Sequence, residues 1–350
     1  MLSLRSFLLA ALAVSTVAGV FISVPLLPPV LPLFLRATGV AHPSMYLLDF
    51  DWLTNRLAAQ CDSDITIQSD GDVDKISTCT KFDGTITIGT KATSISLPTS
   101  LTSITGDLVA NGAGSLRTLE APGLRSIEGT FNLKNLIALS TLSFPDLVSV
   151  DSIQWEVLPA LASLSFTQEI SMADTVLITD TVLTDLRGIN LETVSSLNIN
   201  NNNYLKTIDV ALSNVSQSLT ISSNGRNLNV SLPNLIWANN ITVRDATSLF
   251  VPKLKAVNSS MSFINDTFTT VDFPELIEVG DLAFVSCSKL TNVTVDNLES
   301  IGGTFQIANN TKLSVVKFAS LSKVNGAVDF SGAFTSLVYT LNPALIGNTC

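Results

Sequence analysis

Two stretches of the chain share one apolar pattern, Leu139-Ser-Thr-Leu-Ser-Phe-Pro-Asp-Leu-Val-Ser-Val150 and Phe268-Thr-Thr-Val-Asp-Phe-Pro-Glu-Leu-Ile-Glu-Val279. Units of this kind recur about every 22 residues, and a fixed period of this size is typical of a solenoid. The first apolar residues of the units are Leu116, Leu139, Leu161, Leu183, Leu205, Leu228, Leu249, Phe268, Leu290 and Leu313. A solenoid offers a long repetitive surface, whereas catalysis needs a few convergent groups.

Each unit also contains a short segment in which one residue separates two apolar ones, and such alternation predicts a strand with one buried face. The pairs are Leu108/Ala110, Phe131/Leu133, Ile153/Trp155, Leu197/Ile199, Leu219/Ile221, Ile241/Val243, Met261/Phe263, Leu282/Phe284, Phe305/Ile307 and Val328/Phe330. Prolines 145, 233, 252 and 274 suit the bends between strands, because proline fixes φ and donates no ladder hydrogen bond. Asparagine-rich segments at 198–203 and 309–310 are also placed at bends.

Such coils bury their apolar side only by stacking, with parallel strands about 4.8 Å apart. The sequence therefore predicts an all-β fold, a right-handed parallel β-helix or leucine-rich solenoid of about 10 or 11 coils. We assign the solenoid to residues 61–341, with an N-terminal cap at 61–92 and a short tail at 342–350. Residues 1–19 fit a signal peptide, and residues 20–60 form a leader that matches no repeat. A signal anchor is the alternative, because residues 7–35 carry no charge.

The composition favours an extracellular protein. The chain has 350 residues with 19 basic and 29 acidic side chains, a net charge of −10, and only 14% charged residues. Serine, threonine and asparagine supply the polar surface instead. An acidic chain without basic clusters argues against nucleic acid and against anionic lipid as partners.

Seven N-x-Ser/Thr sequons predict N-glycosylation of a secreted chain, with glycans that shield the solenoid surface. The acceptor residues are Asn214, Asn229, Asn240, Asn258, Asn265, Asn292 and Asn309.

The four cysteines are Cys61, Cys79, Cys287 and Cys350. In an oxidising compartment the nearby pair Cys61 and Cys79 is expected to form a disulfide that closes the first coil and caps the solenoid. For Cys287, which follows a predicted strand, a buried free thiol and a disulfide both stay open, and the partner of Cys350 is open as well.

Catalytic, metal and cofactor residues are not predicted. The single histidine, His42, lies in the leader, which excludes serine-hydrolase triads and histidine-ligated zinc from the coils. Asp70-Gly-Asp72-Val-Asp74 resembles the start of an EF-hand loop, but Lys75 and Lys81 occupy positions that need glycine and glutamate. A turn or short helix is expected there instead.

Polysaccharide-active β-helices use carboxylate pairs, and stacking would bring Asp151 beside Asp174 one coil later. The other carboxylates considered are scattered over the coils: Glu120, Glu128, Asp146, Asp180, Asp185, Asp272, Glu275, Glu278 and Asp281. Trp155, Trp237 and Phe263 are the side chains that would stack on sugars, although the alternating pattern places Trp155 and Phe263 in the core first.

The segment Cys61-Asp-Ser-Asp-Ile-Thr-Ile-Gln-Ser-Asp-Gly-Asp-Val-Asp-Lys-Ile-Ser-Thr-Cys79, followed by Phe82-Asp-Gly-Thr-Ile-Thr-Ile88, resembles the start of fungal GPI-anchored cell-wall integrity and spore-wall proteins. The Leu-x-x-Leu-x-Phe-Pro-x-Leu-x-x-Val coils match that family too, and the resemblance covers about Cys61 to Leu337. It implies a glycosylated solenoid similar to receptor L domains, at the outer membrane face or in the wall. The carboxyl end shows no Ser/Thr-rich spacer and no hydrophobic tail, so the family's GPI anchor is not visible in this chain.

Three functions follow as hypotheses. The resemblance implies a non-enzymatic, monomeric protein that supports fungal cell-wall organisation, with wall glycans or wall proteins as partners. The second hypothesis is a receptor-like module that binds a peptide or glycan, which a cluster of exposed aromatic residues would favour. The third, an enzyme, would need two carboxylates about 5–9 Å apart in a groove.

Overall fold

The computed structural model describes residues 61–332 and 338–341. The chain divides into two units, Met1–Asp49 and Phe50–Cys350, and all described residues belong to the second. The predicted signal peptide 1–19, the leader 20–60 with His42, and the tail 342–350 with Cys350 therefore lie outside the described residues. Within the described ranges, no helix has the length and apolar character needed to cross a membrane.

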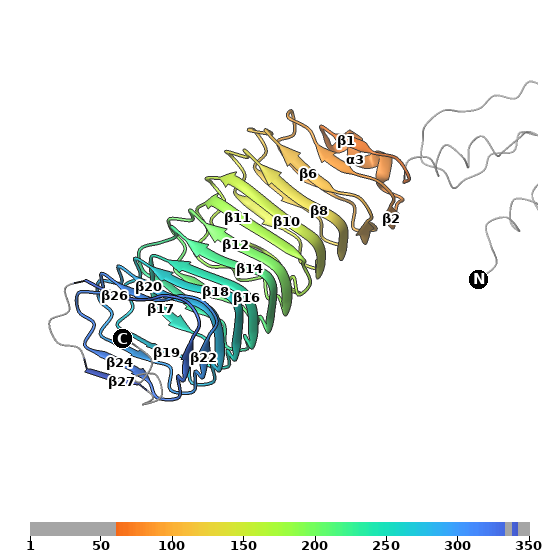
Figure 1. Ribbon diagram of the computed structural model, residues 1–350. Helices are drawn as coiled ribbons and strands as arrows, with labels where there is room; N and C mark the ends of the chain where they lie inside the picture. The colour runs from red at the N-terminus through yellow and green to blue at the C-terminus, as the bar shows by residue number, and fades with distance from the viewer. Residues whose placement is uncertain (1–60, 333–337, 342–350) are drawn as a thin grey trace, which may run out of the picture. The chain divides into compact units, whose positions relative to one another are not determined.

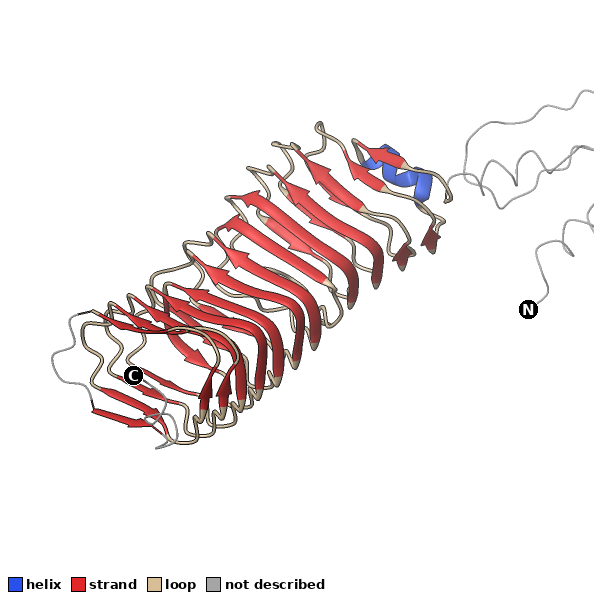
Figure 2. Ribbon diagram, in the orientation of Figure 1, coloured by secondary structure: helices blue, strands red, loops and turns tan. Residues whose placement is uncertain are grey.

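The described residues form a β-solenoid of about 12 turns, each stacked on the previous one through parallel strands (Figures 1 and 2). The prediction of an all-β solenoid is confirmed. The turns outnumber the ten or eleven coils expected from the sequence, because the cap contributes turns of its own. There, β1 (Ile65–Ile67) and β3 (Ile86–Ile88) already stack, and β3 pairs with β6 (Leu108–Asn111).

The largest sheet has 17 parallel strands and runs the length of this unit. Besides β1, β3 and β6 it contains β2 (Lys81–Phe82), β5 (Ser103–Ile104), β8 (Ser126–Lys134), β10 (Ser149–Leu158), β11 (Thr175–Thr181), β12 (Thr193–Asn200), β14 (Asn214–Ser222), β16 (Trp237–Arg244), β18 (Ala256–Ile264), β20 (Glu278–Val285), β22 (Ser300–Ile301), β23 (Phe305–Ala308), β25 (Lys323–Val324) and β26 (Val328–Ser331).

Three smaller parallel sheets complete the turns. They consist of β4 (Ser94–Ser96), β7 (Thr118–Glu120) and β9 (Thr141–Ser143); β13 (Thr207–Asp209), β15 (Leu228–Ser231) and β17 (Ala246–Phe250); and β19 (Thr270–Asp272), β21 (Asn292–Thr294), β24 (Val315–Phe318) and β27 (Val338–Leu341). The described helices are short, α3 (Asp70–Val73) and the 3-10 turn η1 (Asp74–Ile76), and both lie in the cap.

The register of the largest sheet turns the apolar pairs into continuous ladders. Leu197 pairs with Leu219 in the next turn, Leu219 pairs with Ile241 in the turn after that, and all three side chains are buried. Trp155 and Phe263 are fully buried as well, which confirms their expected place in the core. Because every inward position of one turn meets its equivalent in the next, the core is one column of apolar side chains between the sheets.

Tight bends at fixed positions let the short strands close into turns. The four bend prolines lie in turns between strands, as predicted. At the corner after the largest sheet one residue per turn has a positive φ of 53–68°: Gly112, Asn135, Val157, Asp180, Asn201, Ser223, Asp245, Asn265, Ser286 and Asn309. Asparagine and aspartate tolerate this left-handed conformation better than most residues, which explains the asparagine-rich corners.

The N-terminal cap is closed by the predicted disulfide between Cys61 and Cys79, which are 18 residues apart. Cys79 is buried together with Ile76 and Phe82, so the bond ties η1 to the first turns of the core.

Removing the disulfide with the double substitution Cys61→Ser and Cys79→Ser is expected to lower the free energy of unfolding by about 3 kcal/mol, because the bond restricts the unfolded chain. The midpoint of guanidinium unfolding measures this loss, with the wild-type protein under non-reducing conditions as the reference. An unchanged midpoint would show that the cap folds without the bond.

Candidate functional site

All seven predicted glycosylation residues lie in the described part of the chain, and their side chains point to the surface of the solenoid. Three are in the largest sheet (Asn214, Asn240, Asn258), two in the smaller sheets (Asn229, Asn292) and two at left-handed corners (Asn265, Asn309). Five are exposed, whereas Asn240 and Asn292 are half-buried. The sequons therefore surround the C-terminal half of the solenoid on several sides, while residues 61–213 carry none.

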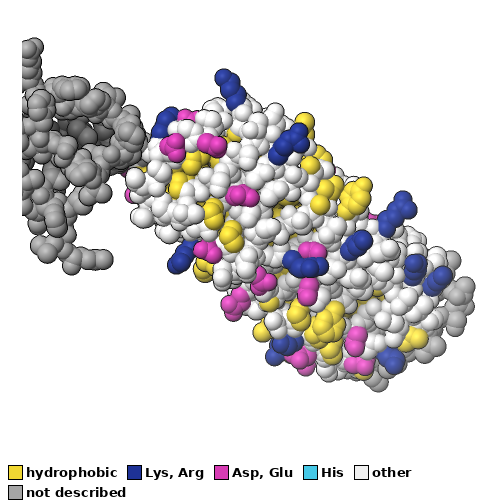
Figure 3. Space-filling view, turned by 180° about the vertical axis from the view of Figure 1, so that it is seen from behind, with side chains coloured by type: hydrophobic (Ala, Val, Ile, Leu, Met, Phe, Trp, Pro, Cys, Tyr) yellow, Lys and Arg dark blue, Asp and Glu magenta, His cyan; other side chains and the backbone are white. Residues whose placement is uncertain are grey.

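The outer surface is mostly uncharged and polar. On the face shown in Figure 3, lysine, arginine, aspartate and glutamate side chains are scattered between uncharged groups, without an extended patch of one sign. The exposed aromatic side chains of the described residues are Tyr204 in the turn between β12 and β13, Phe250 in β17 and Phe330 in β26. They do not form the row along one face that a receptor-like module was expected to show.

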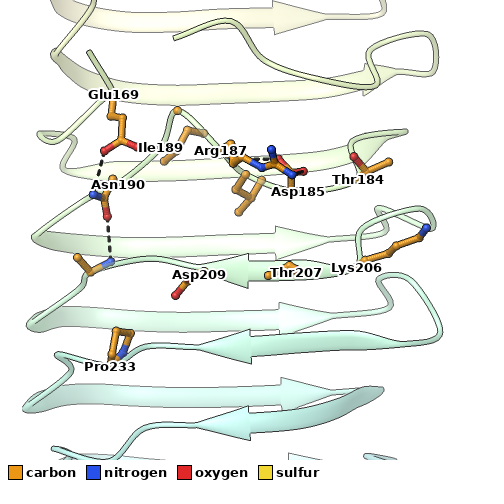
Figure 4. Close-up of a pocket in the computed structure, with 13 residues that line it drawn as sticks. Glu169, Thr184, Asp185, Arg187, Ile189, Asn190, Lys206, Thr207, Asp209 and Pro233 are labelled. Atoms are coloured by element: carbon orange, nitrogen blue, oxygen red, sulfur yellow. Dashed lines mark hydrogen bonds and ion pairs between the residues drawn. The ribbon is translucent and has the colours of Figure 1, made fainter. Parts of the chain in front are cut away.

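A groove of about 800 Å³ lies where the smaller sheets are interrupted between β9 and β13 (Figure 4). On this side of the solenoid, isolated bridges such as Ile170 with Ile189 replace a continuous sheet between the turns. Asn190 Nδ2 donates to Glu169 Oε2 at 3.0 Å, and an Arg187–Asp185 ion pair spans 3.2 Å. The groove thus presents charges of both signs beside amide groups.

A second groove, of about 640 Å³, is lined by Glu128, Asp151 and Asp174. It contains the carboxylate pair considered from the sequence, since Asp174 donates its backbone N–H to the Asp151 carbonyl oxygen at 2.9 Å. The Asp174 carboxylate accepts the Ser195 hydroxyl from the following turn. In the described ranges, no group of three or more histidine, cysteine or acidic residues is arranged to hold a metal ion.

The segment that resembles an EF-hand loop folds into α3 and η1, as expected for a turn or short helix. Asp72 accepts hydrogen bonds from Lys75 Nζ at 2.6 Å and from the Gln68 backbone N–H at 2.9 Å. The hydrogen bond from Lys75 lowers the pKa of the Asp72 carboxyl. This carboxylate therefore ties the helix to the chain before it.

The residue after each left-handed corner points inward and forms a second column, which we call the corner ladder. Its described members are Ala113, Leu136, Leu158, Thr181, Asn202, Asn224, Ala246, Asp266, Cys287 and Asn310. Asn310 Oδ1 accepts the backbone N–H of Cys287 at 2.8 Å, and its Nδ2 donates to the Phe284 carbonyl oxygen at 2.8 Å. Each ladder asparagine thus connects two turns through hydrogen bonds to buried backbone groups.

Asp266 and Cys287 occupy ladder positions where other turns have asparagine. Asp266 Oδ1 accepts the Ala246 backbone N–H at 2.7 Å, but its buried Oδ2 has no hydrogen-bond partner. Burial raises the pKa of this carboxyl to about 8, so it is a neutral acid at pH 7. Cys287 is a buried free thiol whose pKa burial raises to about 12. This resolves the alternative that the sequence left open and makes Cys287 a core residue.

Fold and surface together define a β-solenoid with a polar, sequon-bearing exterior. No protein-family model matches the chain, and no solved structure matches it. Among curated proteins, protein ecm33 of Aspergillus fumigatus is 42% identical over 79% of this chain and 71% of its own length. A cell surface GPI-anchored protein of Arthroderma benhamiae is 36% identical over 80% of this chain and 73% of its own. Sporulation-specific protein 2 of Saccharomyces cerevisiae is 30% identical over 86% and 62%.

The chain belongs to the Ecm33 family of fungal cell-surface and cell-wall proteins. This confirms the family suggested by the cap and coil motifs, and with it the predicted extracellular location at the cell surface or in the wall.

Proposed function

We propose that this protein is a non-enzymatic, N-glycosylated structural component that supports the organisation of the fungal cell wall. The observation that carries the proposal is membership of a family whose relatives are named as cell-wall or cell-surface proteins. The distribution of the sequons supports it, because glycans on several sides of one rod suit a component embedded among other wall polymers. Most apolar residues of the described chain lie in the core column, so serine, threonine and asparagine supply much of the exterior.

A binding module is the second candidate, and the interrupted smaller sheet favours it. Most of the groove, including Glu169, Arg187 and Lys206, lies before the first sequon, and its other end reaches Thr207, the register partner of the sequon residue Asn229. A wall glycan or wall protein could therefore reach the Glu169 end of the groove without meeting an attached glycan. Under this proposal, binding in the groove is how the protein organises the wall.

Expression of the full chain in a fungal strain that lacks its Ecm33-type gene is expected to restore growth on a chitin-binding dye that stresses the wall. The double substitution Asp151→Asn and Asp174→Asn should restore growth equally well, because a structural protein does not need this carboxylate pair. Growth at matched protein levels is the measurement. Failure of the wild-type chain would contradict the wall function, whereas failure of the carboxylate variant alone would favour an enzyme.

The triple substitution Glu169→Gln, Arg187→Gln and Lys206→Gln separates the two candidates in the same assay. These side chains line the groove at the surface, and we expect a change in stability within about 0.5 kcal/mol for each exposed substitution. Loss of growth with a normal protein level would support binding in the groove. Full growth would favour the purely structural role.

A further inference from the structure

We propose that the glycan on Asn214 packs against the indole ring of Trp237 and forms a fixed part of the solenoid surface. The inference rests on the N-glycosylation included in the proposed function. It goes further by naming one sequon whose sugar has a binding surface in the fold, with N-acetylglucosamine, the sugar attached to asparagine, as the ligand.

The register of the largest sheet places the two side chains side by side. Asn214 begins β14, Trp237 begins β16, and the two residues are direct partners in neighbouring parallel strands. Adjacent strands lie about 4.8 Å apart, and partners in register point to the same face of the sheet. Asn214 is exposed, and its Nδ2 donates only to the neighbouring Ser213 hydroxyl at 3.1 Å among the contacts of the described chain.

The surface beside Asn214 has an apolar side and a polar side, which match the apolar face and the polar edges of a pyranose ring. On the C-terminal side lie Trp237, which is half-buried, and Ile236, which is 42% exposed. On the N-terminal side Asn214 borders the groove that contains Asp174 and Ser195. A sugar ring has an apolar C–H face and polar hydroxyl edges, so it can cover the indole while its hydroxyls face the groove.

Other sequons do not have this arrangement. Asn229 in β15 has Thr207 and Ser248 as its register partners, and neither is aromatic. Its Oδ1 accepts the Ser248 hydroxyl at 2.7 Å. Asn229 is exposed like Asn214 and lies 15 residues later in one of the smaller sheets, so it provides a matched control.

Attachment follows the usual chemistry of a sequon. The side-chain nitrogen of Asn214 bonds to the anomeric carbon of an oligosaccharide carried on a lipid diphosphate. The diphosphate leaves with the bonding electrons, and the amide loses one proton. Ser216 completes the sequon and is exposed in the same strand.

The test measures quenching of tryptophan fluorescence by acrylamide in the secreted full chain with Trp52→Phe, which leaves Trp155 and Trp237. Trp155 is fully buried, so Trp237 dominates the quenching. Complete enzymatic removal of N-glycans is expected to raise the quenching constant about twofold, since a sugar covers one of the two faces of the indole. Asn214→Gln and Ser216→Ala should show the same rise without enzyme, whereas Asn229→Gln should match the parent.

Site-by-site peptide mass spectrometry accompanies the measurement and separates the outcomes. An occupied Asn214 together with the expected rise supports the inference. An unoccupied Asn214 beside other occupied sequons, or a quenching constant that deglycosylation leaves unchanged, overturns the inference but keeps the proposed glycoprotein. A chain with no occupied sequon overturns both.

Discussion

Replacing Asp266 with asparagine is expected to remove a large pH dependence from the stability of the solenoid. In the wild-type protein, the free energy of unfolding should fall by on the order of 4 kcal/mol between pH 4 and pH 8. The Asp266→Asn variant should lack this decrease and should therefore be the more stable protein at pH 8. At pH 4 the two proteins should differ much less.

The sign follows from proton binding. Burial raises the pKa of Asp266 from 3.8 to about 8, so between these values the folded chain holds a proton that the unfolded chain has released. Stability falls with rising pH wherever the folded state binds more protons. Half of the folded molecules still hold this proton at the folded pKa, so the contribution of Asp266 becomes flat only about one pH unit higher.

The geometry of the corner ladder explains why asparagine suits this position. Asn224 Nδ2 donates to the Ile199 carbonyl oxygen at 2.9 Å, and Cys287 Sγ donates to the Phe263 carbonyl oxygen at 3.7 Å. Both acceptors lie three residues before the ladder position of the previous turn. By the same offset, an amide introduced at position 266 would face the Val243 carbonyl and offer an N–H donor at every pH, whereas Oδ2 has a proton to donate only while the carboxyl is protonated.

Urea unfolding at pH 4, 6 and 8 measures the difference between the two proteins. The matched control is Asp245→Asn, which changes the corner carboxylate one turn earlier, where the side chain is only half-buried and accepts a hydrogen bond from Asn265. This control should keep most of the pH dependence of the wild type, because burial is the largest cause of the raised Asp266 pKa and the Asp245 charge adds a smaller increase. Parallel curves for wild type and Asp266→Asn would show that the Asp266 carboxyl titrates normally in the folded chain.

Much of the fold was predictable because each turn repeats the same pattern of buried apolar residues and bends. The apolar pairs, from Leu108/Ala110 to Val328/Phe330, lie in strands, and the bend prolines lie in turns. The pair Val176/Ile178 in β11 was missed, because a run of three apolar residues hides the alternation. The first turns were undercounted since their strands are only two or three residues long.

The surface features were less predictable because they depend on distant parts of the chain. The groove with Glu169 and Arg187 lies where the smaller sheets are interrupted between β9 and β13. No local sequence pattern predicts this interruption. Asp266 did carry a usable signal. It lies at the position that Asn202, Asn224 and Asn310 occupy in other turns, so an alignment of the coils on the corner predicts that it is buried.

A substitution in the core column is expected to change the free energy of unfolding by a similar amount. Phe263→Ala is expected to lower the free energy of unfolding by about 3–5 kcal/mol. The Phe263 ring is 1% exposed and contacts Phe284, Phe273 and Phe268, with ring centroids 5.1, 5.7 and 5.9 Å away. Removing it takes away burial and aromatic contacts with three rings at once, and the parallel strands limit how far the turns can close on the space.

Phe250→Ala is the matched control, because it deletes the same side chain at a site that is 56% exposed. Its cost should stay within about 0.5 kcal/mol. Guanidinium unfolding gives both values, and the cost of Phe263→Leu should fall between them.

Hydrogen exchange tests where in the solenoid the effect is felt. In a solenoid each turn contacts only its neighbours, so Phe263→Ala should weaken protection in β16, β18 and β20 before it affects β6 or β8. Equal costs for the two alanine variants, or a uniform loss of protection, would contradict a core built as a column of turn-to-turn contacts. The expected pattern would instead mean that single turns can loosen while the other described turns keep their packing and their surface.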